Sequence, residues 1–95
     1  MVIGCCTIEL YLPGAASLKD KRSVLKSTMH RIRREFNVSL AEVDLQDSLR
    51  FAQIGVAQVT NSKQFGESVM HKILAFVENN ADGRLVDAKI MTEFY

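Results

Sequence analysis

The stretch VIGCCTIELYLPG, residues 2–14, alternates as a half-buried strand does and then turns. Pro13 and Gly14 should end this strand near residue 12, because proline cannot donate to a ladder and glycine permits a tight turn. One predicted face carries Val2, Gly4, Cys6, Ile8, Leu10 and Leu12, and the other carries Ile3, Cys5, Thr7, Glu9 and Tyr11.

A long helix is predicted to follow this strand. Ser17 is a suitable N-cap, and Asp20 lies in the first turn, where a negative charge is favourable. Asn37 is placed to close the helix in a left-handed conformation. The predicted core face of the helix consists of Leu18, Leu25, Met29, Ile32 and Phe36, which recur at helical spacing.

The rest of the chain supplies two strands, a helix and a final strand. Residues 38–45 and 51–60 read as strands on either side of the polar turn 46–48, and Gln58 indicates a bulge or a half-open face. Asn61 or Ser62 should cap the second helix, with Gln64 placed to form a capping box with Asn61. The buried stripe of that helix is predicted to be Phe65, Val69, Met70, Ile73, Leu74 and Val77. Residues 79–83 should break the helix before a last strand at 84–93.

This order of elements predicts an α+β fold. Right-handed crossovers place both helices on one face of a four-stranded antiparallel sheet, which is the ferredoxin-like βαββαβ sandwich. Ile54 and Val56 should join the helix stripes in its core. A chain of 95 residues with 47% hydrophobic content is expected to form a single domain, 1–95.

The cysteines and the N-terminus suggest a cellular location. Cys5 and Cys6 are neighbours on a strand, so they point to opposite faces and should remain free thiols in a reducing compartment. The first residues have no basic start and carry Glu9 within the apolar run, unlike a signal peptide or a membrane span. We expect a cytoplasmic protein.

Three runs carry a family resemblance: PGAASLKDKR at 13–22, FNVSLAEVDLQD at 36–47 and IGVAQVTNS at 54–62. With them, essentially the whole chain resembles the bacterial YlxP-like family, whose function is unknown. The resemblance implies a ferredoxin-like fold and a gene near translation and ribosome-maturation genes, including that of ribosome-binding factor A. The positions that match the family pattern are Ser17, Leu18, Lys19, Lys21, Arg22, Asn37, Glu42, Asp44, Gln46 and Asp47. Leu45 departs from it, since the resemblance implies a polar residue there, often His; this weakens any ligand site at that turn.

The charge of the chain is concentrated in its first helix. Residues 17–36 hold seven Lys and Arg against two acids, a net +5, whereas the remaining residues hold five against nine, a net −4. A basic stripe on one helix is typical of a protein that contacts a polyanion, although a solvated helix face is the alternative. The candidate nucleic-acid contacts on the wheel are Lys19, Arg22, Lys26, Arg33 and Arg34. The expected partner is ribosomal RNA or a ribosome precursor.

The predicted mode of binding is contact with phosphates. Base stacking on the open sheet is the usual mode of this fold, but the run RFAQIGVA lacks the alternating glycines and aromatics of the RNA-recognition signature. The first strand offers only Tyr11. Contacts from the helix to the RNA backbone remain, and these read shape and charge.

The chain shows no signature of an enzyme. The loop from Gly14 to Ser17 lacks the Gly-Lys-Ser/Thr ending of a phosphate loop, and it lacks the arginine that acylphosphatases, which share the fold, place after the first strand. His30 and His71 have no nucleophile at motif spacing and are expected on the surface. The acids Glu42, Asp44 and Asp47 read as surface charges or caps. We therefore expect no catalytic residues, no cofactor and no metal.

The sheet face opposite the helices suggests a rival function. Ile3, Cys5, Tyr11 and Val59 are predicted there and would leave the face partly apolar. Such faces are commonly covered by a partner. The rival is therefore a protein–protein or self-association module, with a homodimer as its simplest form.

Overall fold

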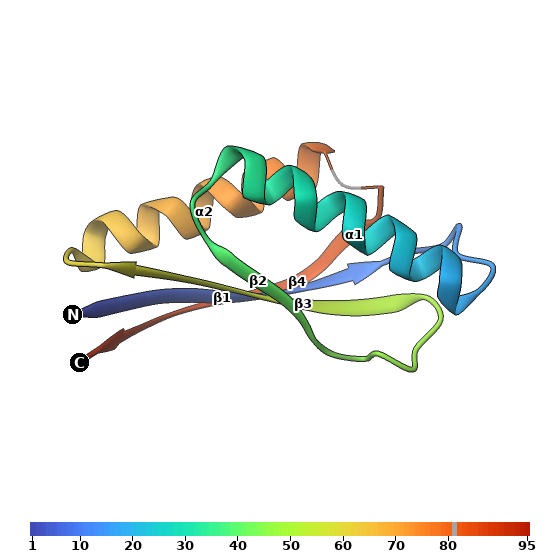
Figure 1. Ribbon diagram of the computed structural model, residues 1–95, viewed down its shortest axis with the longest axis horizontal. Coiled ribbons are helices and arrows are strands. Elements are labelled where there is room, and N and C mark those ends of the chain that lie inside the picture. Colours follow the sequence, from blue (N-terminus) through green and yellow to red (C-terminus); the bar gives the residue numbers. More distant parts are fainter. Residues whose placement is uncertain (81) are drawn as a thin grey trace.

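The computed structural model describes residues 1–80 and 82–95, and its elements come in the predicted order (Figure 1). They are β1 (Val2–Tyr11), α1 (Leu18–Glu35), β2 (Ser39–Asp44), β3 (Phe51–Thr60), α2 (Lys63–Asn80) and β4 (Arg84–Phe94). The predicted bounds of β1, β3 and β4 were correct to within one residue. Ala81, in the predicted break at 79–83, lies outside the described residues.

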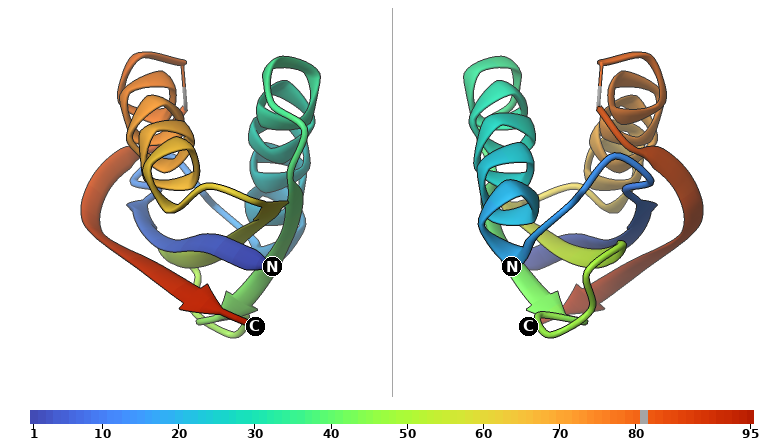
Figure 2. Two further views of the ribbon diagram at one scale, coloured as in Figure 1. Left: turned by 90° about the vertical axis from the view of Figure 1, so that its left-hand side faces the viewer. Right: turned by 90° about the vertical axis from the view of Figure 1, so that its right-hand side faces the viewer.

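The four strands form one sheet in the order β2-β3-β1-β4, and every neighbouring pair is antiparallel. Figure 2 shows both helices side by side on one face of this sheet, with no helix on the other face. This arrangement confirms the ferredoxin-like βαββαβ prediction. It leaves β2 and β4 as the edge strands, with α1 above the β2 side.

The core lies between the helices and the inner face of the sheet. The predicted alternation of β1 is confirmed, because Ile8 and Leu10 are fully buried whereas the residues between them are half-exposed. On β3, Ile54 lies opposite Ile8 and Val56 lies opposite Cys6, and both are buried, as predicted. The helices contribute Leu25, Ile32, Val69, Met70, Ile73 and Val77; Met29 and Leu74 pack against this core half-buried, and Leu18 is half-exposed.

Helix α2 approaches the sheet backbone closely. A Cβ atom on Gly4 of β1 would lie 3.3 Å from the Cα atom of Gly66 on α2. Gly66 therefore occupies the inward position in the first turn, and the predicted burial of Phe65 is wrong: this side chain is 56% exposed. Ser62 caps the helix, since its Oγ accepts from the Phe65 backbone N–H at 3.1 Å. This fits one of the two predicted caps, not the box between Asn61 and Gln64.

The two ends of α1 differ in how well the sequence predicts them. Ser17 is the N-cap, and its Oγ accepts from the Asp20 N–H at 3.1 Å, as predicted. The left-handed closure at Asn37 is wrong, because the chain leaves the helix at Phe36 in an extended conformation (φ −134°, ψ 139°). The Phe36 ring packs edge-on against Phe76 of α2, with 5.8 Å between ring centroids, which directs the chain straight into β2.

The irregularities of the sheet lie away from Gln58. The β1–β3 ladder runs without a break past the Gln58–Gly4 pair, so the predicted bulge is wrong. Register shifts occur instead at Glu9/Leu10 against β4 and at Glu42/Asp44 against β3. Strand β2 is shorter than predicted because it stops at Asp44, and Leu45 then adopts a left-handed conformation with φ 61°.

Neither of the helices that the structure describes is long and apolar enough to cross a membrane.

Candidate nucleic-acid interface

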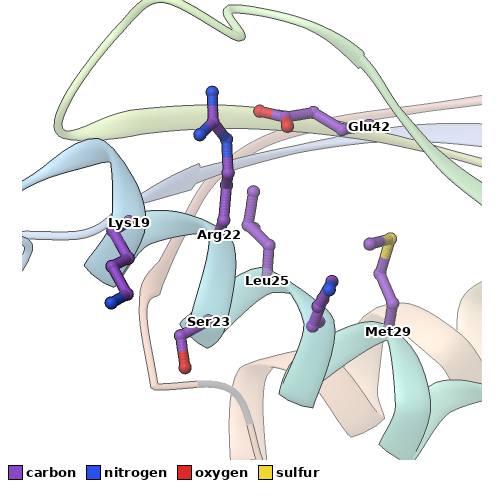
Figure 3. Close-up of a pocket in the computed structure, with 7 residues that line it drawn as sticks. Lys19, Arg22, Ser23, Leu25, Met29 and Glu42 are labelled. Atoms are coloured by element: carbon purple, nitrogen blue, oxygen red, sulfur yellow. The ribbon is translucent and has the colours of Figure 1, made fainter.

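Three of the five predicted contact residues lie together on α1. Lys19, Arg22 and Lys26 follow at spacings of three and four residues, which places them on one helix face. They line a hollow of about 530 Å³ with Ser23, Leu25 and Met29 of α1 and Glu42 of β2. Figure 3 shows Arg22 extending toward the Glu42 carboxylate, while Lys19 projects from the preceding turn away from it.

The seven cations of α1 divide according to their partners. Lys21 and Arg31 each have an acid within 4 Å: Lys21 pairs with Glu42, and Arg31 pairs with Asp82. The other five make no ion pair with any acid in the described part of the chain. These five are Lys19, Arg22, Lys26, Arg33 and Arg34, the same residues that the helical wheel selects as candidate contacts.

Lys21 is withdrawn from the basic surface altogether. Its side chain is 1% exposed, and its Nζ donates to the carbonyl oxygens of Leu45 and Ser48, both at 2.6 Å. The Glu42 Oε2 lies 3.3 Å from the same Nζ. Lys21 thus ties α1 to the loop between β2 and β3 and neutralises an acid at the edge of the core, so it cannot reach a ligand.

Arg31 is occupied at the other end of the helix. One of its guanidinium nitrogens donates to the carbonyl oxygen of Asn80, and the other lies 3.2 Å from the Ser27 Oγ and 3.4 Å from Asp82. These bonds join α1 to the end of α2. Arg31 therefore acts as a link between the helices.

Arg33 and Arg34 lie apart from the hollow. Arg33 donates to the carbonyl oxygen of Leu40 at 3.0 Å and lines a separate depression with Asn37 and Val59 at the β2 edge of the sheet. Arg34 lines another depression with Phe76 of α2. The predicted set therefore forms one cluster of three cations and two outlying arginines.

Glu42 is the site residue that the sequence analysis misread as a surface charge. It pairs with Ile54 across the ladder, so it faces the helices, and its side chain is only 20% exposed. Asp44 lies beyond the register shift and is exposed, as predicted for a surface charge, and its Oδ1 accepts from the Leu45 N–H at 2.7 Å. The sequence does contain a signal that Glu42 faces inward, because it lies two positions after the apolar Leu40 on the same strand. An acid in such a position needs a partner of opposite charge. Among the residues with described positions, no three His, Cys, Asp or Glu side chains gather as metal ligands would.

The open face of the sheet carries a second hollow, of about 410 Å³. Small residues line it, including Cys5, Ala57 and Gly55, and the Val43 side chain, which also lines it, lies next to Gly55. Val59 on this face is 65% exposed. At the other end of the face, Tyr11 packs against Phe51 with ring centroids 5.2 Å apart, an aromatic neighbour that the sequence analysis did not place there.

The Cys6 thiol is not an activated nucleophile. Burial, with a smaller contribution from the neighbouring Cys5, raises the pKa of Cys6 to about 11, so this thiol is protonated at neutral pH. Both cysteines are free, and His30 and His71 are exposed as predicted.

Comparisons with known proteins agree with this description. The family described as "Protein of unknown function (DUF503)" matches residues 3–90. The "Uncharacterized protein YlxP" of Bacillus subtilis (strain 168) is 36% identical over 78 residues, which cover 82% of this chain and 85% of that protein.

One solved structure supports the fold. The solution structure of LFR1 1, a de novo designed protein with ferredoxin fold, matches at a TM-score of 0.54 and 11% identity, covering 98% of this chain and 83% of that one. Another designed protein, Ferredog-Diesel, matches at a TM-score of 0.49 and 9% identity over 94% of this chain and 83% of its own.

The family match spans nearly the whole chain, and the resemblance to YlxP-like proteins is confirmed. The chain belongs to the DUF503 family of proteins of unknown function.

Proposed function

We propose that the protein is a non-enzymatic factor that binds the backbone of RNA through the basic face of α1. One observation carries this proposal: five cations of one helix have no acidic partner in the described chain, and three of them surround one hollow. Cations held near one another without counter-charges attract a polyanion. Lys19, Arg22 and Lys26 are the principal phosphate contacts, and Arg33 and Arg34 extend the contact along the helix.

Ribosomal RNA or a ribosome precursor is the partner we propose, in a cytoplasmic setting where Cys5 and Cys6 stay reduced. The contact is one of charge and shape, because three of the residues that line the hollow are cations on a helix. Such binding has little sequence preference. Its affinity should therefore depend strongly on salt.

The salt dependence of binding tests the proposal. Each neutralised phosphate releases condensed counterions, so the three principal contacts predict a log–log slope of about −2 on single strands and about −3 on duplexes, and all five contacts predict about −3.5 and about −4.5. The double variant Arg22→Gln, Lys26→Gln should weaken binding to every RNA sequence about equally and flatten the slope by roughly 1.5. The measurement is sedimentation with ribosomal subunits, and titration of labelled RNA, over a range of salt concentrations.

A matched control removes two other lysines. Lys72 on α2 and Lys89 on β4 are exposed and lie outside the hollow. The variant Lys72→Gln, Lys89→Gln should keep the wild-type slope. Wild-type protein that binds neither ribosomal particles nor RNA at low salt would contradict the proposal, and so would tight binding that ignores salt.

A second candidate function is self-association through the open sheet face. The observation that favours it is the apolar hollow on this face, with Val59 65% and Val43 49% exposed beside it. A symmetric pair of such faces would bury these side chains in a homodimer. Light scattering at tens of micromolar should then report twice the monomer mass; a monomer at every concentration would exclude this candidate.

A further inference from the structure

We propose that the hollow between α1 and β2 holds a ribose–phosphate unit, in which Arg22 binds the phosphate and Glu42 accepts a hydrogen bond from the ribose 2′-hydroxyl. The protein would then distinguish RNA from DNA without reading its sequence. This inference rests on the proposed function and names the chemical group that the site selects.

Arg22 and Glu42 have opposite charges and line the same hollow, yet they form no ion pair. Arg22 and Glu42 both line it, and Figure 3 shows the Arg22 side chain extending toward the Glu42 carboxylate. Yet Arg22 has no acid within 4 Å of its guanidinium group in the described part of the chain. A guanidinium and a carboxylate that face one hollow without contact suit a ligand with an anionic group for one and a donor for the other.

The negative charge of Glu42 does not neutralise the cations around the hollow. Its charge is balanced by Lys21, whose Nζ lies 3.3 Å from Oε2. The ion pair is neutral as a unit, so Lys19, Arg22 and Lys26 keep their attraction for phosphate. Glu42 then contributes an acceptor to a site whose net charge remains positive.

Glu42 has one carboxylate oxygen that can accept a hydrogen bond from a ligand. Its Oε2 is buried and makes no hydrogen bond beyond the ion-pair contact, so one carboxylate oxygen is left for a ligand. A cytosine N4 amino group could also donate to one oxygen, but it lies on the base edge, away from the backbone phosphate that the cations bind. A single acceptor beside cations matches the 2′-hydroxyl, a single donor that neighbours a phosphate in every ribonucleotide.

The test compares an oligoribonucleotide with its 2′-fluoro counterpart of the same sequence, because fluorine keeps the sugar pucker of RNA but cannot donate a hydrogen bond. Wild-type protein should bind the RNA roughly 3- to 10-fold more tightly, the difference expected from one hydrogen bond. Glu42→Gln should reduce this ratio toward one, because a neutral amide is a weaker acceptor than a carboxylate. Its absolute affinity for both oligonucleotides should rise, since a negative charge near phosphates is removed. Because Glu42→Gln leaves the buried Lys21 without its counter-charge, the double variant Lys21→Met, Glu42→Gln, in which no unpaired charge remains, should show the same reduced ratio, and urea unfolding checks that both variants are folded.

Asp44→Asn is the matched control, since it removes a negative charge from the same strand on an exposed residue. It should raise the affinity for both oligonucleotides and leave their ratio at the wild-type value. Equal wild-type affinities for the two oligonucleotides, or an unchanged ratio in Glu42→Gln, would overturn the inference while salt-dependent binding left the proposed function intact. Wild-type protein that binds neither oligonucleotide at low salt would overturn both.

Discussion

Lys21 changes the character of α1 more than any other side chain of the helix. It stands among basic residues, yet its side chain is buried and its Nζ bonds two carbonyl oxygens of the β2–β3 loop. One of these belongs to Leu45, whose φ of 61° is uncommon for a residue with a bulky side chain. The bond from Lys21 thus holds a backbone conformation that the Leu45 side chain disfavours. Asn, Asp and His adopt this conformation more often, which gives a physical reason for the polar residue that the family resemblance implies at this position.

Replacing Lys21 with methionine should therefore destabilise the fold strongly. The variant keeps the volume of the side chain but leaves the Glu42 carboxylate without its counter-charge, and removing one partner of a buried pair costs about 3 kcal/mol or more. Urea unfolding measures the loss. The double variant Lys21→Met, Glu42→Gln should recover part of it, because no unpaired charge remains. A loss in Lys21→Met no larger than that of an exposed lysine would show that the ion pair and its two carbonyl bonds stabilise nothing.

The two helices are fixed to the sheet in different ways, and this difference places the hollow. Helix α2 approaches β1 closely at Gly4 and Gly66, since a Cβ atom on Gly4 would lie 3.3 Å from the Gly66 Cα. Helix α1 reaches the β2 side with long side chains, Lys21 to the loop and Arg33 to Leu40. Long polar side chains leave space between a helix and an edge strand, and the hollow with Glu42 lies in that space.

Gly4→Ala tests the close packing of α2 on β1. A Cβ atom at position 4 would meet the Gly66 Cα at 3.3 Å and its carbonyl group at 3.5 Å, so backbone would have to move, at about 1–3 kcal/mol. Gly14→Ala is the control, because a Cβ there meets nothing within 4 Å and its φ is not positive. Gly14→Ala should be neutral or stabilise by about 0.5 kcal/mol through the unfolded chain. Chemical denaturation compares the two, and equal stabilities would show that α2 does not need the glycine contact.

On the scale of the whole molecule, the two candidate surfaces lie on opposite sides of the sheet. Lys19, Arg22 and Lys26 belong to α1, which lies on the helix side of the sheet (Figure 2), whereas the apolar hollow with Cys5 and Ala57 lies on the bare side. Val59 of the bare face lies near the boundary between the two, because it also lines a depression with Arg33. Nothing prevents one molecule from using both. A dimer formed through the bare faces would carry two basic helices, and linked sites bind a long RNA more tightly than one site does.

Val59→Lys separates the two surfaces. It places a charge on the open face at a side chain that is 65% exposed, so the folded monomer should tolerate it. If the face pairs with a second copy, the variant should be monomeric by light scattering, while its binding to a short RNA keeps the wild-type salt slope. A dimer that persists in Val59→Lys would place the contact elsewhere, and a changed slope on short RNA would mean that the depression which Val59 shares with Arg33 contacts the nucleic acid.

The sequence by itself determined the element order, the layer arrangement and the core of the two halves. Strand alternation in β1, helical spacing in α1 and α2, and the cap at Ser17 are local patterns set by the period of the backbone and by nearby bonds. The concentration of positive charge in α1 is likewise a property of composition. The exits of elements, at Phe36 and Leu45, were not predictable in this way, because an aromatic contact with α2 and a bond from Lys21 fix them.

Only the tertiary structure decided which charges are available for binding. Seven cations are equivalent along the sequence of α1, but Lys21 and Arg31 meet acids from residues far along the chain. The alternation from Leu40 places Glu42 on the inward face of β2, but only the tertiary structure shows that Lys21 is its partner. Whether a charged side chain is free or paired depends on contacts between distant segments, and local sequence patterns contain no information about those distances.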